Sequence, residues 1–528
     1  MITDKIKENK TILGVEFGST RIKAVLSLEG GQILATSDYG WENSLVDGLY
    51  TYDLEEAWTG LRHCYSTIYE TVKKDYQTEL TGLGALGFSG MMHGYLAFDR
   101  EGELLAPFRT WRNTNTGEAT EILRPLLKFN IPHRWTIAHL YQAILDNEDH
   151  LDRLDFLTSL SGYIHRTLTG EKVLGIGEAS GLFPIDEKSL DYNQAMIDKF
   201  DKLSAEKGFG KKLRDLLPKV LVAGDAGGRL TRQGALLIDP TGRLQAGALL
   251  CPPEGDAGTG MVATNSIRPR TGNISAGTSI FSMLVLEKDL KNYYAEVDMV
   301  TTPAGRPVAM VHCNTCTSDL DAWVRLFHEF AQVSDPDIDI GQVYTLLYHK
   351  ALEADADCGG LLAYNFYSDE PVVKTGGGFP LFIRKANADL RLANFMRAHL
   401  YSSFACLKLG MDLLLSEEDL AIDRLLGHGG LFKQKGIAQQ FMADALNTRV
   451  EVNETASEGG AWGMAILAEY RLMKKEGQSL EDYLDDVIFK DNKSLAALPE
   501  SEGRKGFLAF MENYEKGLEL EDRASKIM

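Results

Sequence analysis

The sequence lacks the features that mark membrane, secreted and nucleic-acid-binding proteins. Its six cysteines are scattered over 528 residues, too few for a disulfide framework, which agrees with a reducing compartment. The first ten residues are polar and charged, and no run approaches the ~18 to 20 apolar residues of a membrane helix. Lys and Arg number 55 against 75 Asp and Glu, a formal charge of −20 without a basic cluster. We therefore expect a cytoplasmic protein that binds neither nucleic acid nor membrane.

Three further motifs are missing or incomplete. No GxxxxGKS or GxxxxGKT sequence occurs, which excludes a Walker-type ATPase. The glycines at 82, 84 and 87 fit a dinucleotide fingerprint, but they lead into an expected strand instead of opening a helix, so we interpret them as a loop. His312, Cys313 and Cys316 lie close together, yet structural zinc needs four ligands and no second pair has suitable spacing.

What the sequence does contain is three short turns that suit phosphate binding. They are EFGST at residues 16–20, GDAG at residues 255–258 and GTS at residues 277–279. A phosphate needs backbone N–H groups aimed at its oxygens, which glycine permits, together with hydroxyls and a carboxylate that holds a metal ion. Three such turns predict two half-sites that close on a nucleotide.

The order of apolar patterns predicts an α/β protein whose first half is repeated in outline. Residues 11–28 predict a strand, a turn and a second strand, and residues 273–286 predict the same unit again. A chain of this length exceeds what one core usually serves. We place a first domain at residues 1–267 and a second at 268–475, with 476–528 as a helical C-terminal appendage. Further strands are expected at 83–88, 95–98 and 308–311, and helices at 54–74, 138–168 and 323–330.

Several longer segments, in order, resemble the FGGY family of carbohydrate kinases. They are FSGMMHGYLAFD (88–99), TWRN (110–113), LTGEKVLGIGEASGLFPID (168–186), GDAGTG (255–260), SAGTS (275–279) and GHGGLFKQKGIAQQFMADAL (427–446). The resemblance covers most of the chain. It implies two ribonuclease H-like domains, of the actin and hexokinase type, on either side of a deep cleft. It also implies ATP and Mg²⁺ as cofactors and a small sugar as the other substrate.

The sugar-side motifs look most like the xylulokinase branch of that family. The resemblance implies a ketopentose substrate, with D-xylulose as first choice and L-ribulose as second. It further implies that Met92 and His93 line the sugar pocket, and that Trp111, Arg112 and Asn113 lie beside it.

Asp256 is the residue that best fits the catalytic base. Transfer of a phosphoryl group to a sugar hydroxyl needs a base near that hydroxyl, and small neighbours let both substrates approach. The family's catalytic aspartate occupies the position of Asp256 in its G-D motif. A second GDAG sequence contains Asp225, but it precedes GGRLT, which resembles a non-catalytic loop of the family, so we assign Asp225 to a surface turn.

The nucleotide side is implied by the same resemblance. Glu16 stands where the family has an aspartate that contacts Mg²⁺, often through water, and Asp256 would be the second carboxylate at the metal. The longer side chain either shifts the metal site or impairs catalysis. The residues expected to bind ATP and its phosphates are Gly18, Ser19, Thr20, Lys23, Gly277, Thr278, Ser279, Gly427, Gly429 and Gly430.

Two departures from the family leave a second interpretation open. Glu16 is one, and the other is the loss of the Glu-Gly pair that relatives carry shortly after the equivalent of Arg397 and Ala398. A sugar-binding, nucleotide-binding or regulatory protein on the same fold is therefore the alternative. Relatives are often dimers, which leaves a homodimer open.

Overall fold

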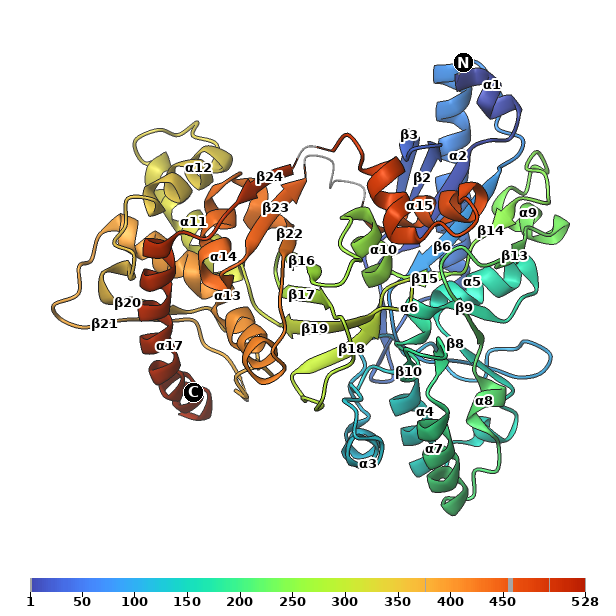
Figure 1. The fold of residues 1–528 in the computed structure, drawn as a ribbon, viewed down its shortest axis with the longest axis horizontal. Helices are drawn as coiled ribbons and strands as arrows, with labels where there is room; N and C mark the ends of the chain where they lie inside the picture. Colours follow the sequence, from blue (N-terminus) through green and yellow to red (C-terminus); the bar gives the residue numbers. More distant parts are fainter. Residues whose placement is uncertain (1, 376, 454–458, 493, 528) are drawn as a thin grey trace.

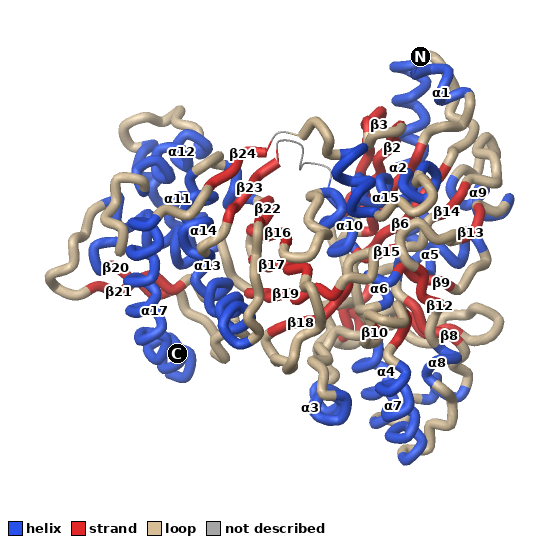
Figure 2. The backbone as a smooth tube through the Cα atoms, viewed as in Figure 1, coloured by secondary structure: helices blue, strands red, loops and turns tan. Residues whose placement is uncertain are grey.

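The computed structural model describes residues 2–375, 377–453, 459–492 and 494–527. Within these ranges the chain forms two lobes, each built on a seven-stranded sheet with helices packed against it (Figure 1). Figure 2 shows the two sheets in separate halves of the molecule, with the longer helices around them. The expected α/β architecture with two domains is confirmed. Among the described residues, no helix is both long and apolar enough to cross a bilayer.

The first sheet is organised around strand β1, which pairs antiparallel with β2 and parallel with β6. The hairpin expected at residues 11–28 is therefore confirmed. The strands of this sheet are β1 (Ile12–Phe17), β2 (Arg21–Leu28), β3 (Gln32–Gly40), β6 (Ala85–Gly90), β13 (Gly228–Arg229), β14 (Leu249–Leu250) and β15 (Glu254–Gly255). Its main covering helices are α2 (Leu54–Tyr76), α10 (Asp256–Ala263) and α15 (Gly459–Met473).

Strand alternation gives the two faces of β1 different neighbours. Leu13, Val15 and Phe17 belong to a buried core shared with α2. Gly14 and Glu16 point the other way and lie against α15. Because both faces are covered by helices, five of the six residues of β1 are buried, and Glu16, next to its last residue, is half-buried.

The second sheet repeats this arrangement. Strand β16 pairs antiparallel with β17 and parallel with β22, as β1 does with β2 and β6, so the unit expected at residues 273–286 is confirmed. Its strands are β16 (Thr271–Ala276), β17 (Ile280–Val285), β18 (Val297–Thr301), β19 (Pro307–Cys313), β22 (Arg424–His428), β23 (Arg449–Asn453) and β24 (Ser494–Ala497). The helices of this lobe are α11 (Ser318–Gln332), α12 (Ile340–Ala351), α13 (Leu392–Glu417), α14 (Ile437–Leu446) and α17 (Ser501–Ile527).

Shorter elements fill the space around the sheets. The helices are α1 (Ile2–Lys7), α3 (Gly117–Leu127), α6 (Ile176–Ala179), α7 (Gln194–Glu206), α8 (Leu213–Leu216), α9 (Arg232–Ile238), α16 (Leu480–Tyr483), η2 (Cys358–Gly360), η3 (Gly430–Lys433) and η4 (Leu484–Ile488). The strands are β4 (Ser44–Val46), β5 (Leu49–Thr51), β7 (Leu96–Phe98), β9 (Val173–Gly175), β10 (Ile185–Asp186), β11 (Asp191–Tyr192), β12 (Lys219–Leu221), β20 (Leu361–Tyr364) and β21 (Leu381–Arg384).

The single helix expected at residues 138–168 is wrong. The structure has α4 (Thr136–Leu145), a short 3₁₀ helix η1 (Asp149–Asp152), strand β8 (Phe156–Thr158) and α5 (Leu160–Thr169). Asn147 has a φ of 53°, a left-handed conformation that ends the first helix and that asparagine tolerates. The apolar spacing continues across the break because β8 and α5 are also buried.

The C-terminal residues are built into both lobes. Helix α15 returns to the first sheet, although it falls within residues 268–475 of the sequence. The segment expected as an appendage supplies β24, which pairs with β23 at the edge of the second sheet, and α17, which packs against α14 and β20. Residues 476–528 therefore share the core of the second lobe, since Phe507, Phe510 and Tyr514 are buried there.

The β18–β19 hairpin of the second lobe reaches the first lobe. Arg134 forms an ion pair with Asp298 of β18, and Asn130 donates to the same carboxylate at 2.9 Å. The backbone N–H of Thr301 donates to Ser180 Oγ at 3.1 Å. These polar contacts fix how the two lobes face each other.

Candidate active site

Three elements meet where the chain leaves β1, and glycines make their approach close. A β-carbon placed on Gly14 would lie 2.2 Å from the carbonyl oxygen of Ala461 on α15. One placed on Gly463 would lie 2.1 Å from the carbonyl oxygen of Thr259 on α10. Real β-carbons are not found so close to backbone atoms, so only glycine allows α15 to sit between β1 and α10. This packing brings the end of β1, with Glu16, toward the start of α10.

Asp256 is the first residue of α10 and is held by backbone donors. Its Oδ1 accepts hydrogen bonds from the backbone N–H of Ala257 at 2.9 Å and of Met92 at 3.3 Å. Burial raises the pKa of Asp256 above its ordinary value, and these donors lower it again. A helix N-terminus also favours a negative charge. The carboxylate is thus oriented and partly desolvated, as a general base requires.

Glu16 lies near Asp256 and faces Lys23. Burial, followed by the charge of Asp256, raises the pKa of Glu16 to about 7, although Lys23, its cross-strand neighbour, acts to lower it. Gly460 packs against the carboxyl group, since a β-carbon there would lie 2.6 Å from Glu16 Oε1. Two neighbouring carboxyl groups, one of which raises the pKa of the other, are a donor set that suits Mg²⁺, so the residues present fit the metal that the resemblance implies.

Met92 and His93 form a strained turn beside Asp256. His93 has a φ of 71° and Gly94 a φ of 91°, and a β-carbon on Gly94 would lie 2.6 Å from the carbonyl oxygen of Arg109. The backbone in this conformation aims the Met92 N–H at Asp256. Strain of this kind is kept where the surroundings hold it in place, which is common at functional sites.

The His93 ring is fixed in one tautomer. It stacks on Trp135 with ring centroids 6.0 Å apart, and its Nδ1 lies 3.3 Å from the carbonyl oxygen of Gly181. Burial lowers the pKa of His93 well below its ordinary value, so the ring is neutral. Since a carbonyl only accepts, Nδ1 carries the hydrogen and Nε2 is an acceptor. A neutral acceptor of this kind can receive a hydrogen bond from a sugar hydroxyl.

The structure gives two of the three residues at 111–113 a scaffold role. The Asn113 amide pairs with the backbone of Tyr50, accepting from its N–H at 2.9 Å and donating to its carbonyl oxygen at 2.8 Å. Arg112 lies 4.0 Å from the Tyr50 ring and donates to Asn43 at 3.1 Å. Trp111 is 39% exposed. These contacts tie the 110–113 loop to β5. An antiparallel β-bridge between Tyr95 and Arg109 places the start of this loop beside the His93 turn.

The turn at residues 18–20 is anchored through its carbonyl groups. Trp41 donates from its ring nitrogen to the Gly18 carbonyl oxygen at 2.7 Å and from its backbone to that of Thr20 at 3.2 Å. The Tyr52 hydroxyl donates to the Ser19 carbonyl oxygen at 2.6 Å. With its carbonyl groups held by these side chains, the turn has a fixed shape at the end of β1.

The second lobe brings its two glycine turns together. Parallel pairing sets Ser275 opposite His428, so the turn of Gly277, Thr278 and Ser279 and the turn that begins at Gly429 and Gly430 follow neighbouring strands at the same sheet edge. Gly427 lies within β22, paired with Ile274. Gly429 has a φ of 102°, and a β-carbon there would lie 2.3 Å from the carbonyl oxygen of Ala276. In Figures 1 and 2, α10 lies on the side of the first lobe that faces β16 and β22.

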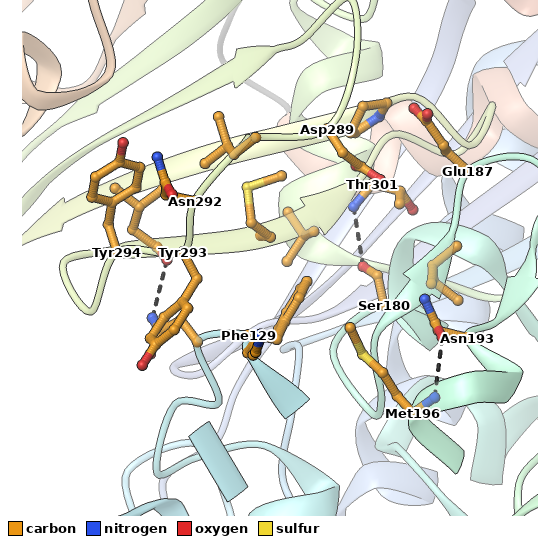
Figure 3. A pocket seen from close by; sticks show the side chains of 18 of the residues that line it. Phe129, Ser180, Glu187, Asn193, Met196, Asp289, Asn292, Tyr293, Tyr294 and Thr301 are labelled. Atoms are coloured by element: carbon orange, nitrogen blue, oxygen red, sulfur yellow. Dashed lines mark hydrogen bonds between the residues drawn. The ribbon is translucent and has the colours of Figure 1, made fainter. Parts of the chain in front are cut away.

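A cavity of about 210 Å³ lies between the lobes, apart from these residues (Figure 3). The first lobe contributes Phe129, Ser180 and Met196 to its wall, and the second contributes residues 289–301 in part. None of the residues predicted for the sugar or ATP lines it. Ser180, which lines this cavity, directly precedes Gly181, whose carbonyl oxygen lies 3.3 Å from His93 Nδ1.

Sequence reasoning missed several residues of the site. Glu178 and Glu254 are fully buried carboxyl groups on either side of Gly255, and Trp135 carries the His93 ring. Glu178 lies in the GEASG sequence within residues 168–186, so its motif was visible but its position beside Asp256 depends on the fold. Asp225 is placed in a turn, where its carboxylate accepts from the Val222 N–H at 3.0 Å.

Comparison with known proteins identifies the family. Residues 11–238 match the N-terminal domain of the FGGY family of carbohydrate kinases, and residues 272–472 match its C-terminal domain. The chain is 22% identical over 443 residues to a xylulose kinase of Haemophilus influenzae, covering 81% of this chain and 83% of that one. A match to a xylulose kinase of Staphylococcus xylosus, 21% identical, covers 36% of this chain and only 40% of that protein.

Solved structures show the same fold at low sequence identity. A kinase from Brucella ovis described as a xyloylose kinase superposes with a TM-score of 0.77 at 17% identity, covering 96% of this chain and 98% of that one. A gluconate kinase from Lactobacillus acidophilus gives 0.77 at 16% identity, covering 98% of both chains. A Plasmodium falciparum glycerol kinase with ADP gives 0.76 at 17% identity, covering 97% and 98%. The chain belongs to the FGGY family of carbohydrate kinases.

Proposed function

We propose that this protein transfers the γ-phosphate of ATP to a primary hydroxyl of a ketopentose, with D-xylulose as first choice and L-ribulose as second. The observation that carries this proposal is the position of Asp256. Its carboxylate lies at the start of α10, is oriented by the Met92 and Ala257 N–H groups, and shares its surroundings with Glu16. A base beside a metal-binding carboxylate is what phosphoryl transfer to an alcohol requires.

Each part of the site then has a role. Asp256 would take the proton from the sugar hydroxyl, and Met92 and His93 would hold the sugar beside it. Glu16 and Asp256 would hold Mg²⁺, which when bound would neutralise charge on the phosphates. The residues that would bind ATP are those of the glycine turns in the two lobes together with Lys23. Closure of the lobes would keep water from the γ-phosphate.

The choice of a ketopentose rests on the relatives and on the His93 turn. Curated relatives include xylulose kinases and a gluconokinase of Bacillus subtilis, and structural neighbours include xylulose, gluconate and glycerol kinases. We also propose a cytoplasmic location, which the six buried, unpaired cysteines support. A homodimer is part of the proposal because relatives are often dimers, and light scattering on the purified protein tests it.

The test is ADP release with Mg²⁺-ATP across a panel of sugars. The panel contains D-xylulose, L-ribulose, D-ribulose, L-xylulose, L-fuculose, glycerol and gluconate. Asp256→Asn should lower kcat by about 10²- to 10⁴-fold, the usual contribution of a general base. Asp225→Asn, in the second GDAG sequence, is the matched control and should retain wild-type turnover. Near-wild-type turnover of Asp256→Asn would refute the assignment of the base.

Glu16 supports a second candidate function. If ATP or a sugar binds but no sugar stimulates ADP release, the chain is a binding or regulatory member of the family. Glu16→Asp then becomes informative, because it restores the residue that relatives carry. Appearance of kinase activity in that variant would show that Glu16 had altered the metal site.

A further inference from the structure

Glu178 has a buried carboxyl group without a partner. The residue is 0% exposed, and neither carboxyl oxygen makes a hydrogen bond of normal geometry among the described residues, although the Ser159 hydroxyl lies near enough to lower the pKa of Glu178. Burying a polar group without a hydrogen bond is costly, and most buried polar atoms in folded proteins are paired. A fully buried carboxyl group with both oxygens unpaired therefore points to a group that is absent from the free chain.

The neighbouring Glu254 differs from Glu178 because its carboxyl group connects two elements of the fold. Its Oε2 accepts from the backbone N–H of Glu178 at 3.0 Å. It also packs closely against α6, because a β-carbon on Gly177 would lie 2.5 Å from that oxygen. Glu254 thereby ties α6 to β15. Glu178 makes no such connection with its side chain.

The carboxyl group of Glu178 lies among the residues proposed to hold the sugar. A β-carbon placed on Gly255 would be 2.4 Å from Glu178 Oε2 and 2.3 Å from Met92 Cγ. Gly255 directly precedes Asp256, whose charge is one of the causes that raise the pKa of Glu178. On the next turn, the carbonyl group of Gly181 holds His93. Glu178, Met92 and Asp256 thus converge around one backbone position.

The charges at this position are of one sign. Burial is the largest cause that raises the pKa of Glu178 well above its ordinary range; the Ser159 hydroxyl acts to lower it, and the charges of Asp256 and Glu254 raise it further. Arg134 is near enough to lower the pKa of His93, but its guanidinium group forms an ion pair with Asp298. A sugar hydroxyl would therefore find hydrogen-bonding groups here. An anionic ligand would find no unpaired cation among the groups named.

We propose that the carboxyl group of Glu178 hydrogen-bonds to a hydroxyl of the bound sugar and favours neutral ketoses and polyols over aldonates. This inference rests on the proposed sugar kinase function. It assigns a specificity residue that the sequence motifs did not, and it predicts that gluconate, the substrate named for one structural neighbour, is a poor substrate of this protein.

The experiment compares Glu178→Leu, Glu178→Gln and wild type. Glu178→Leu removes the hydrogen-bonding group and should raise KM for the ketopentose about 10- to 100-fold, with KM for ATP changed less than threefold. Glu178→Gln keeps a hydrogen-bonding group in place and should stay within about fivefold of wild type. The ratio of kcat/KM for ketopentose over gluconate should fall at least tenfold in Glu178→Leu.

Glu370→Gln is the matched control. Glu370 is equally buried but lies in the second lobe, where its Oε2 accepts from the Asn314 N–H at 2.9 Å, so its substitution should leave KM for the sugar unchanged. If Glu178→Leu does not fold, Glu178→Asp tests the same point by withdrawing the carboxyl group by one methylene, and it should also raise KM for the sugar. An unchanged KM in the folded Glu178 variants would overturn the proposal.

The two proposals fail in different ways. If wild type turns over a ketopentose and Glu178 variants bind it normally, only the role of Glu178 is refuted. If wild type turns over no sugar, the proposed function fails, and calorimetric titration of D-xylulose into wild type and Glu178→Leu tests the binding role alone. Equal affinities in that titration would overturn it.

Discussion

Substitution of Gly463 by alanine tests whether the packing of α15 on α10 sets the geometry of the site. The new β-carbon would lie 2.1 Å from the carbonyl oxygen of Thr259, whereas real β-carbons stay about 3 Å or more from such atoms. The two helices must therefore separate by roughly 1 Å. Overpacking of this size costs about 1 to 3 kcal/mol, which a large two-lobed protein can survive. Asp256, at the start of α10, would move relative to Glu16.

A displacement of about 1 Å between catalytic groups can lower a rate about 100-fold. We therefore expect Gly463→Ala to reduce kcat for ADP release about 10- to 100-fold while circular dichroism shows a folded protein. Gly210→Ala is the control, since a β-carbon there meets no atom within 4 Å. A folded Gly463→Ala variant with kcat within twofold of wild type would refute this account of the site.

Three further predictions follow from single contacts. Arg134→Ala removes the ion pair with Asp298 between the lobes, and a loss of about 1 kcal/mol should raise KM for the sugar about fivefold; an unchanged KM would mean that this contact does not stabilise the binding arrangement. Burial raises the pKa of Glu370 from 4.5 to about 7, so the folded protein binds a proton that the unfolded chain releases in this window, and the free energy of unfolding falls as pH rises through it. Glu370→Gln should lessen that fall by up to about 3 kcal/mol, seen as a smaller change in urea midpoint between pH 4.5 and 8 than in wild type, and equal changes would contradict the shift. Because all six cysteines are buried, a thiol reagent at pH 8 should label fewer than one thiol per native chain and six after unfolding, and rapid labelling of native protein would contradict the burial.

Much of the fold could be predicted because its signals are local. The β1–β2 and β16–β17 hairpins follow from apolar runs interrupted by glycine turns, and these are the units that the structure repeats. The break at Asn147 was not predictable from periodicity, since the residues on either side remain buried. The return of α15 to the first sheet depends on contacts over about 450 residues of sequence, such as that between Gly14 and Ala461, which no local pattern encodes.

The candidate site divides in the same way. The glycine turns and Asp256 carry their chemistry in short motifs, so their residue types already indicated phosphate transfer. The scaffold role of Asn113 could not be predicted from its motif, because its side-chain amide hydrogen-bonds to the backbone of Tyr50, 63 residues away. Glu178 was hidden for the opposite reason. Its importance arises from burial beside Gly255 and from the absence of a partner among the described residues, and both follow only from the folded chain.

The most direct test of the central claim is phosphorus NMR of a mixture of the protein, Mg²⁺-ATP and D-xylulose. We expect a sugar phosphate monoester to form in step with ADP, with the phosphate on a primary hydroxyl, and to be absent with Asp256→Asn. L-Ribulose is measured in parallel because it is the second choice of substrate. Release of ADP with inorganic phosphate alone, or equal product with Asp256→Asn, would contradict the account.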